Sequence, residues 1–242
     1  MSPSLTNAFK NLDTKKACPL CGGEGVPLVD AVVVAGQPLC RRCATKVSME
    51  PSRLADLTQE QLEEHLAYRK QNMQKLQGFA DTYECPLFGE DFELASLLID
   101  EAAGTFMISG IPNPPVFSLE QITEVTYQED DRVIRRVWKG GREEGSSVMN
   151  DLVEYDKDYD AIDYTLNFFL RLDIGKKWRK KLPHDLTLKI KLKDDPYWNE
   201  YVVRTDAPTY HNQQAERYVN DYNRATGGFL EAVDTLESYL NA

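Results

Sequence analysis

The second half of the chain, from residue 93 onward, alternates between short apolar runs and turn-forming residues. Segments typical of turns, such as EAAG, IPNPP, EDD and DDPYW, separate the runs. Short strands at this spacing favour an antiparallel arrangement, so we predict a β barrel or sandwich of about seven strands within residues 89–242. The predicted strands are ELASLLID, TFMISG, EQITEVTYQ, RVIRRVWK, IDYTLNFFLRLDI, LTLKIKL and NEYVVRT.

A long helical pattern closes the chain over residues 209–240. Its apolar residues recur at alternating spacings of three and four, which places them on one face of a helix. Such a face needs a surface to cover, and the predicted β domain supplies one. The Gly227–Gly228 pair is a candidate kink. The apolar face consists of Ala215, Tyr218, Tyr222, Ala225, Phe229, Ala232, Leu236 and Tyr239.

A second helix is predicted upstream, in LTQEQLEEHLAYRKQNMQKL, within a connector spanning residues 51–88. Thr58 and Gln61 have the spacing of a capping box, and Leu57 precedes them as a hydrophobic staple. We expect a linking helix that packs on one neighbour, with a partner-binding helix as the alternative. Its apolar stripe consists of Leu62, Leu66, Met73 and Leu76.

The first 50 residues contain two Cys-x-x-Cys pairs, formed by Cys18, Cys21, Cys40 and Cys43 and separated by 18 residues. This spacing is typical of a zinc site in which each pair supplies two thiolates to one tetrahedral ion. We predict one structural zinc per chain; four thiolates leave no position for a catalytic water. Two disulfides, a redox pair, or iron bound to the same ligands are the alternatives.

The residues around the cysteines predict a treble-clef-like finger with its core at residues 18–43. Gly22 and Gly23 allow a tight turn under the metal. LVDAVVV and LC read as two strands joined by AGQP, and RRCATKVSM can begin a helix with Cys43 in its first turn. The fifth cysteine, Cys85, has no sequence partner and is expected to be a small, partly buried apolar residue.

Charge and composition limit the partners. Hydrophobic residues make up 42% of the chain, and neither a secretory signal nor a membrane-spanning run is recognised, so we expect a cytoplasmic protein. The net charge is −11, divided into +2 for residues 1–57 and −13 for the remainder. This balance disfavours nucleic acid as a general partner. If the finger did bind nucleic acid, Arg41, Arg42 and Lys46 would be the contacts.

One loop departs from the acidic background. The run GKKWRKK at residues 175–181 concentrates five cations around a tryptophan. We expect it to contact an anionic partner: an acidic protein face, an anionic ligand, a membrane surface with phosphate-bearing lipids or, less favoured, a nucleic acid, with the indole adding stacking or interfacial contact. The alternative is that it balances the nearby acidic segment DKDYDAID or is simply solvated. The residues are Lys176, Lys177, Trp178, Arg179, Lys180 and Lys181.

No sequence pattern supports a catalytic site. GGREEGSS has the glycine spacing of a phosphate-binding loop but lacks its lysine, and DKDYDAID lacks the glycine and final glutamate of a calcium loop. The chain has only three histidines, which lie far apart. We therefore expect a non-catalytic protein; an enzyme would reveal itself by a deep pocket with converging polar groups in the β half.

Several stretches together resemble a bacterial family of uncharacterised proteins: CPLCGG with GQPLCRRC, EQLEEHLAYRKQNMQKLQGF, VFSLEQITEV and LKIKLKDDPYWNEYVV. The resemblance covers most of residues 18–240. It implies an N-terminal four-cysteine finger, which is itself a domain of unknown function, and after it a pleckstrin-homology-like β domain. The family carries the four cysteines as metal ligands and no established catalytic residue. The insert at 139–150 and the basic run after Gly175 are particular to this sequence.

The expected protein is therefore α+β: a finger in residues 1–50, a linking helix and connector in 51–88, and a β domain with its closing helix in 89–242. Its expected function is that of a zinc-binding interaction or adaptor protein that binds a protein or an anionic surface. A nucleic-acid-linked regulator and an enzyme are the alternatives.

Overall fold

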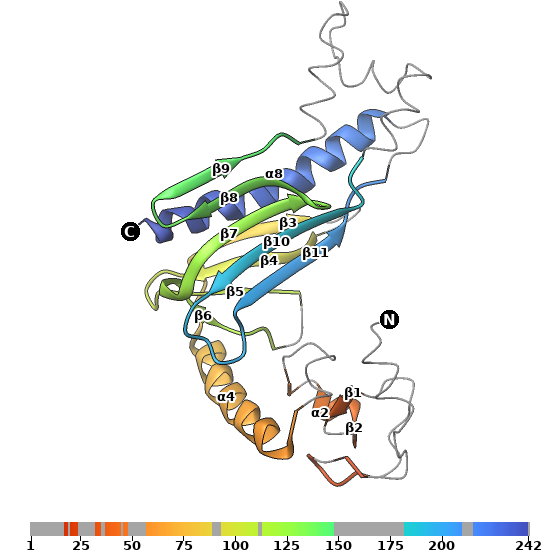
Figure 1. Ribbon diagram of the computed structural model, residues 1–242, viewed down its shortest axis with the longest axis vertical. Coiled ribbons are helices and arrows are strands. Elements are labelled where there is room, and N and C mark those ends of the chain that lie inside the picture. Colours follow the sequence, from red (N-terminus) through yellow and green to blue (C-terminus); the bar gives the residue numbers. More distant parts are fainter. Residues whose placement is uncertain are drawn as a thin grey trace, which may run out of the picture. The chain divides into compact units, whose positions relative to one another are not determined.

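The computed structural model describes residues 17–18, 20–23, 32–34, 37–44, 46–47, 57–88, 93–110, 113–147, 182–209 and 215–241. The chain divides into two compact units: residues 1–80 with 111–116, and residues 81–110 with 117–242. Helices and antiparallel sheets are present together, so the fold is α+β as predicted (Figure 1). Among the described residues, no helix has both the length and the apolar character needed to cross a membrane.

The first unit joins a small hairpin to a long helix. Strands β1 (Val32–Val34) and β2 (Gln37–Leu39) pair antiparallel, and the one-turn helix α2 (Arg41–Ala44) follows at once. Helix α4 spans Gln59–Gly78 and has the predicted capping box. The Gln61 backbone N–H donates to Thr58 Oγ1 at 3.2 Å, and Thr58 N–H donates to Gln61 Oε1 at 2.9 Å. A small apolar cluster of the finger packs on α4 through Leu62.

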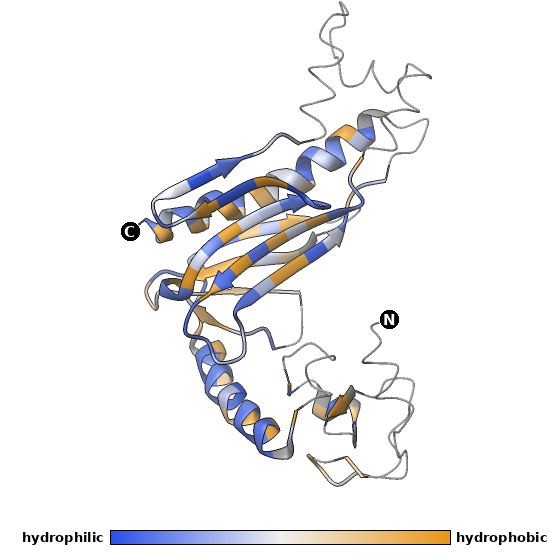
Figure 2. Ribbon diagram, in the orientation of Figure 1, coloured by the Kyte–Doolittle hydropathy of each residue, from blue (hydrophilic) through white to orange (hydrophobic). Residues whose placement is uncertain are grey.

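Helix α4 packs on the finger cluster through part of the predicted stripe. Only Leu62 is fully buried; Leu66, Met73 and Leu76 are half-buried. The helix is mainly hydrophilic (Figure 2), and the other buried positions on it are polar. The spacing gave no sign of these buried polar positions, because apolar periodicity does not reveal which polar side chains find partners in the folded chain. The buried polar residues of α4 are His65, Arg69 and Asn72.

Asn72 and Arg69 are buried because they satisfy the backbone of residues 113–116, which belong to the same unit. Asn72 Nδ2 donates to the Val116 carbonyl at 2.8 Å, and the Val116 N–H donates to Asn72 Oδ1 at 2.9 Å. The Arg69 guanidinium donates to Asn72 Oδ1 at 3.0 Å and to the Asn113 carbonyl at 2.7 Å. A buried side-chain amide that pairs both ways with one residue fixes the register of this segment on α4.

The second unit contains two antiparallel sheets and a helix. One sheet has the strand order β11-β10-β7-β8-β9, and the other has β3-β4-β5-β6. Over the described residues the sheets stay separate, so the closed-barrel alternative is wrong. The strands are β3 (Tyr83–Phe88), β4 (Glu93–Asp100), β5 (Thr105–Ile108), β6 (Phe117–Ser118), β7 (Ile122–Glu129), β8 (Arg132–Trp138), β9 (Gly141–Glu144), β10 (Asp185–Leu192) and β11 (Glu200–Asp206), with the 3-10 helix η2 at Leu119–Gln121.

Most strand predictions correspond to observed strands, with alternating hydrophobic and hydrophilic positions (Figure 2). The run IDYTLNFFLRLDI lies outside the described residues. Strand β3 is a correction, because the sequence analysis assigned its residues to the connector. As an edge strand it tolerates Pro86, while Cys85 and Leu87 point into the core. Strands β6 and β9 are also additional to the predicted set.

The closing helix α8 (Ala215–Leu240) packs against strands from both sheets: β3, β7 and β8. It is one continuous helix through Gly227 and Gly228, the candidate kink position. Phe229 and Leu236 are fully buried, as predicted, and the Phe229 ring stacks on Tyr127 with centroids 5.4 Å apart. The apolar core therefore lies between the two sheets and α8.

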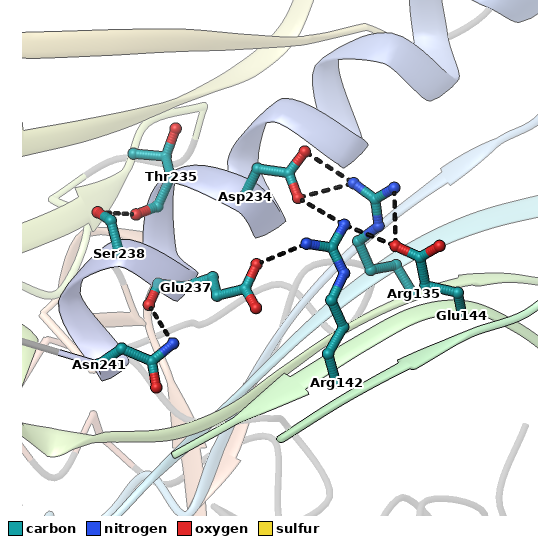
Figure 3. A network of polar contacts seen from close by, with 8 residues as sticks. All are labelled: Arg135, Arg142, Glu144, Asp234, Thr235, Glu237, Ser238 and Asn241. Carbon is teal, nitrogen blue, oxygen red and sulfur yellow. Dashed lines mark hydrogen bonds and ion pairs between the residues drawn. The ribbon is translucent and has the colours of Figure 1, made fainter. Parts of the chain in front are cut away.

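Ion pairs at the rim hold α8 against strands β8 and β9 (Figure 3). Arg135 Nη1 donates to both carboxylate oxygens of Asp234 at 2.7 Å, so the two oxygens share one guanidinium nitrogen. Arg142 bridges Glu237 at 3.0 Å and Glu144 at 2.7 Å. Each pair has at least one partner that is well exposed to solvent, so each contributes about 0–1 kcal/mol and mainly orients the helix.

Candidate metal centre

Three local structures carry the four cysteines. A tight knuckle holds Cys18 and Cys21: the Cys18 N–H donates to the Gly23 carbonyl at 2.8 Å, and the Gly22 N–H donates to the Cys18 carbonyl at 2.8 Å. Gly22 has φ of +68°, which a residue with a side chain adopts only with strain. Cys40 follows strand β2 directly, and Cys43 lies in α2. Local turns therefore form each cysteine pair, and the Cys40 N–H, which donates to Cys18 Sγ at 3.5 Å, joins the two pairs.

The four sulfur atoms converge. All four Sγ atoms lie within 4.8 Å of one another, and the Sγ atoms of Cys21 and Cys40 are 3.7 Å apart. With Zn–S bonds of about 2.3 Å, the edge of a regular tetrahedron is about 3.8 Å. The Cys21–Cys40 distance matches that edge. It is far longer than a disulfide bond of about 2.05 Å, and all five cysteines of the chain are free thiols. The arrangement could hold a metal ion.

The protonation of the site favours a cation as well. Burial by itself would raise the pKa of Cys18, but hydrogen bonds from the backbone N–H groups of Cys40, Leu20 and Cys21 lower it to about 6. Burial and hydrogen bonds among the neighbouring sulfurs raise the pKa of Cys43 to about 12. Four neighbouring thiols cannot all become thiolates without a positive charge among them, because the negative charges repel one another. A divalent cation among them would remove this conflict, because it stabilises every thiolate at once.

Cys85 is separate from this site. It is fully buried in the second unit, where its Sγ donates to the Gly228 carbonyl at 3.4 Å. Burial raises its pKa to about 11, so the thiol is protonated at neutral pH and poorly reactive. This agrees with the expected role of a small buried apolar residue.

The other predicted contacts have different outcomes. The cationic loop Lys176–Lys181 lies outside the described residues. Of the candidate nucleic-acid contacts, Arg42 and Lys46 are solvent-exposed, whereas the side chain of Arg41 is not among those described. Two exposed cations beside the metal centre agree with the positive charge of the N-terminal part of the chain.

Sequence analysis missed a pocket of about 440 Å³ in the first unit. Four of its residues lie on one face of α4 at positions i, i+3, i+4 and i+7, and that spacing was the signal in the sequence. The accessible wall is almost entirely apolar. The pocket is lined by Lys46, Leu66, Arg69, Lys70, Met73 and Asn113.

A second pocket, of about 310 Å³, lies in the second unit between α8 and strands β7–β9. At its wall Glu129, only 2% exposed, accepts hydrogen bonds from the hydroxyls of Tyr127, at 3.3 Å, and Tyr222. Burial raises the pKa of both tyrosines, and the carboxylate raises it further, so both remain protonated donors. Strand alternation places Glu129 on the same face as Tyr127, but it gives no sign that the carboxylate is buried.

Comparisons with family models, curated proteins and solved structures find no match for this chain.

Proposed function

We propose that the first unit binds one structural zinc ion through Cys18, Cys21, Cys40 and Cys43. The observation that carries this proposal is the convergence of four sulfurs within 4.8 Å. Zinc is the preferred ion because it favours tetrahedral thiolate coordination without redox chemistry. The knuckle, hairpin and helix start then correspond to a treble-clef-like finger that zinc stabilises. With every coordination position filled by sulfur, the ion supports the fold and takes no part in catalysis.

Metal analysis of the purified full-length chain tests this proposal. We expect one zinc per chain after purification without chelator. Addition of a strong chelator should release the metal and make four further thiols reactive, while Cys85 should stay slow because it is buried. Stoichiometric iron would assign the same ligands to another metal. Four reactive thiols with no bound metal would reject a metal centre.

We further propose that the chain is a non-catalytic, cytoplasmic interaction protein. Its second unit would be a pleckstrin-homology-like domain, in line with the family resemblance of the sequence. Two antiparallel sheets covered by a C-terminal helix support this assignment. Reduced cysteines support an intracellular location. The contrast between an acidic chain and its local cationic segments supports an anionic partner, above all an acidic protein face.

The cationic loop is the part of this proposal that is easiest to test. We expect replacement of Lys176, Lys177, Arg179, Lys180 and Lys181 by Gln to leave the melting temperature nearly unchanged but to reduce partner capture. The loss should be smaller at higher salt, because exposed charges are screened over about 8 Å at physiological ionic strength. Unchanged capture together with a markedly lower melting temperature would show that the loop has a structural role instead.

Exposed Arg42 and Lys46 on the finger support nucleic-acid binding as a second candidate function. If it is correct, the chain should be retained on DNA or RNA with an affinity that falls steeply as salt rises. Reversing both charges should abolish that retention. Absence of retention at low salt would remove this candidate.

The pocket at Glu129 supports a third candidate, an enzyme or small-ligand site in the second unit. A buried carboxylate between aromatic rings suits an organic cation, through charge and cation–π attraction. A thermal-shift screen of small amines should then give a hit that Glu129→Gln abolishes. A screen without hits would leave Glu129 as a structural anchor for Tyr127 and Tyr222.

A further inference from the structure

The pocket on helix α4 has the chemistry of a peptide-docking site. We propose that it binds an acidic segment of a protein partner, which inserts an apolar side chain between Leu66 and Met73 while its carboxylates contact Lys46 and Lys70. This inference rests on the proposed interaction function and names the chemistry of one partner. All residues involved belong to the first unit.

The first argument is the unusual distribution of polar and apolar side chains on α4. The helix buries Arg69 and Asn72 against the backbone of residues 113–116. Leu66 and Met73, which are apolar, remain half-buried. A helix that served only as a spacer would bury its apolar side chains and expose its polar ones. Here Arg69 and Asn72 are used internally, and two apolar residues of the same helix, Leu66 and Met73, line an open pocket, which is a feature of interaction sites.

The second argument is the shape and lining of the pocket. Its volume of about 440 Å³ falls within the usual range for binding sites, about 300–1,000 Å³. Leu66 and Met73 lie seven residues apart, two turns along the same face of α4. The buried Arg69 guanidinium and the Asn113 carbonyl, joined at 2.7 Å, hold one wall in place. A rigid apolar wall favours an apolar anchor from the partner, and the flexible Met73 can adapt to its shape.

The third argument is charge complementarity. Lys46 and Lys70 line the pocket and are solvent-exposed. Within the described part of the chain, no carboxylate lies within ion-pair distance of either ammonium group. Their methylene stems add to the apolar wall while the charges point to solvent. An apolar anchor flanked by carboxylates would satisfy both features, whereas a basic segment would be repelled.

The direct test uses the zinc-loaded full chain and a labelled synthetic peptide in which leucines are flanked by glutamates. Fluorescence anisotropy should detect binding that weakens as salt rises. Two control peptides of equal length replace the leucines by alanine or the glutamates by lysine. Each control should bind at least about tenfold more weakly, because one lacks the anchor and the other is repelled. Equal binding of all three peptides would overturn the proposal.

Variants of the chain locate the binding. The double variant Lys46→Glu with Lys70→Glu should lower the affinity for the peptide at least about tenfold. Met73→Ala should lower that affinity by a comparable factor. Lys75→Glu is the matched control, because Lys75 is exposed on the same helix but does not line the pocket. In methionine-methyl NMR spectra, the peptide should shift the Met73 signal and leave Met107, in the second unit, unchanged. A shift at Met107 alone, or equal losses for Lys75→Glu, would also overturn the proposal.

One further arm separates this inference from the proposed function. Affinity capture of a native partner is repeated with the Lys46→Glu and Lys70→Glu double variant. Loss of capture supports the pocket as the docking site. Undiminished capture overturns the pocket while the interaction function stands. Self-association of the chain that Met73→Ala abolishes would identify a second copy as the occupant, and the acidic-partner proposal would then be wrong.

Discussion

Gly228 and Gly227 are neighbours in helix α8, yet we expect their replacement by alanine to change stability in opposite directions. A Cβ atom built on Gly228 would lie less than 3.0 Å from the backbone oxygen of Pro86 in strand β3. Real Cβ atoms essentially never approach another atom so closely, and here the neighbour is backbone that cannot rotate away. At Gly227 the added atom would meet nothing within 4 Å.

The expected magnitudes follow from two opposing effects. Replacing glycine by alanine in a helix interior stabilises it by about 1 kcal/mol, and Gly227→Ala should show most of this gain. Overpacking typically costs about 1–3 kcal/mol, and displacement of a paired strand belongs at the upper end of that range. Displacement of β3 would also disturb the hydrogen bond from Cys85 Sγ to the Gly228 carbonyl. We therefore expect Gly228→Ala to lower stability by about 2 kcal/mol, some 3 kcal/mol below Gly227→Ala.

Tryptophan fluorescence is the appropriate assay, because all three tryptophans, Trp138, Trp178 and Trp198, belong to the second unit. Urea unfolding followed in this way reports on α8 and its sheets without a signal from the finger. Thermal unfolding can be followed by the same fluorescence. At about 2–4 °C per kcal/mol, the melting temperature should fall by about 4–8 °C for Gly228→Ala and rise by about 1–4 °C for Gly227→Ala. Equal stabilities for the two variants would refute the close approach of α8 to β3.

Three further predictions concern both units. Cys18→Ser should abolish metal binding and unfold the finger, while the tryptophan-detected transition stays unchanged, since the second unit has its own core. Phe229→Ala and Leu236→Ala should each cost about 2–5 kcal/mol in the same urea assay; a loss below about 0.5 kcal/mol for both would contradict their burial. Burial opposes ionisation of Glu124, but the hydrogen bond from Arg136 outweighs it and holds the pKa of that carboxyl below its usual range. Glu124→Gln should therefore lower stability by about 1 kcal/mol at pH 7, and the difference from the unmodified protein should disappear as the pH falls below about 4. A difference that stays constant down to pH 3 would show that the ion pair is not its cause.

The metal centre is the feature that the sequence alone specified best. Its four ligands lie within 26 residues, and short-range rules place them: a glycine turn, a hairpin and the start of a helix. The convergence of the sulfurs adds one contact between the two pairs, from the Cys40 N–H to Cys18 Sγ, within the same short segment. The local sequence also specifies the buried face of α8, because the helical period of 3.6 residues fixes which side chains lie on one face. The predicted burial of Phe229 and Leu236 follows from that period.

Tertiary structure decided which polar groups are buried. Nothing in the local sequence separates Asn72 from an exposed asparagine on a hydrophilic helix. Its burial depends on the backbone of Val116, 44 residues further along the chain. Glu129 is similar, since its partner Tyr222 comes from the closing helix, 93 residues away. Burial of a polar group is favourable only when a partner satisfies it, so local patterns cannot predict it.

Tertiary structure also decided the order of the strands and the approach of the helix to them. Strand β10 pairs with β7 instead of β9, which precedes it among the described strands, and β3 joins a sheet although its sequence contains Pro86. Apolar alternation specifies which residues face the core but not which strand lies alongside, because any strand edge offers the same backbone hydrogen-bonding groups. Sequence alone marks Gly227 and Gly228 equally as helix-weakening residues. Only the packing of β3 against one of them makes Gly228 necessary and leaves Gly227 replaceable.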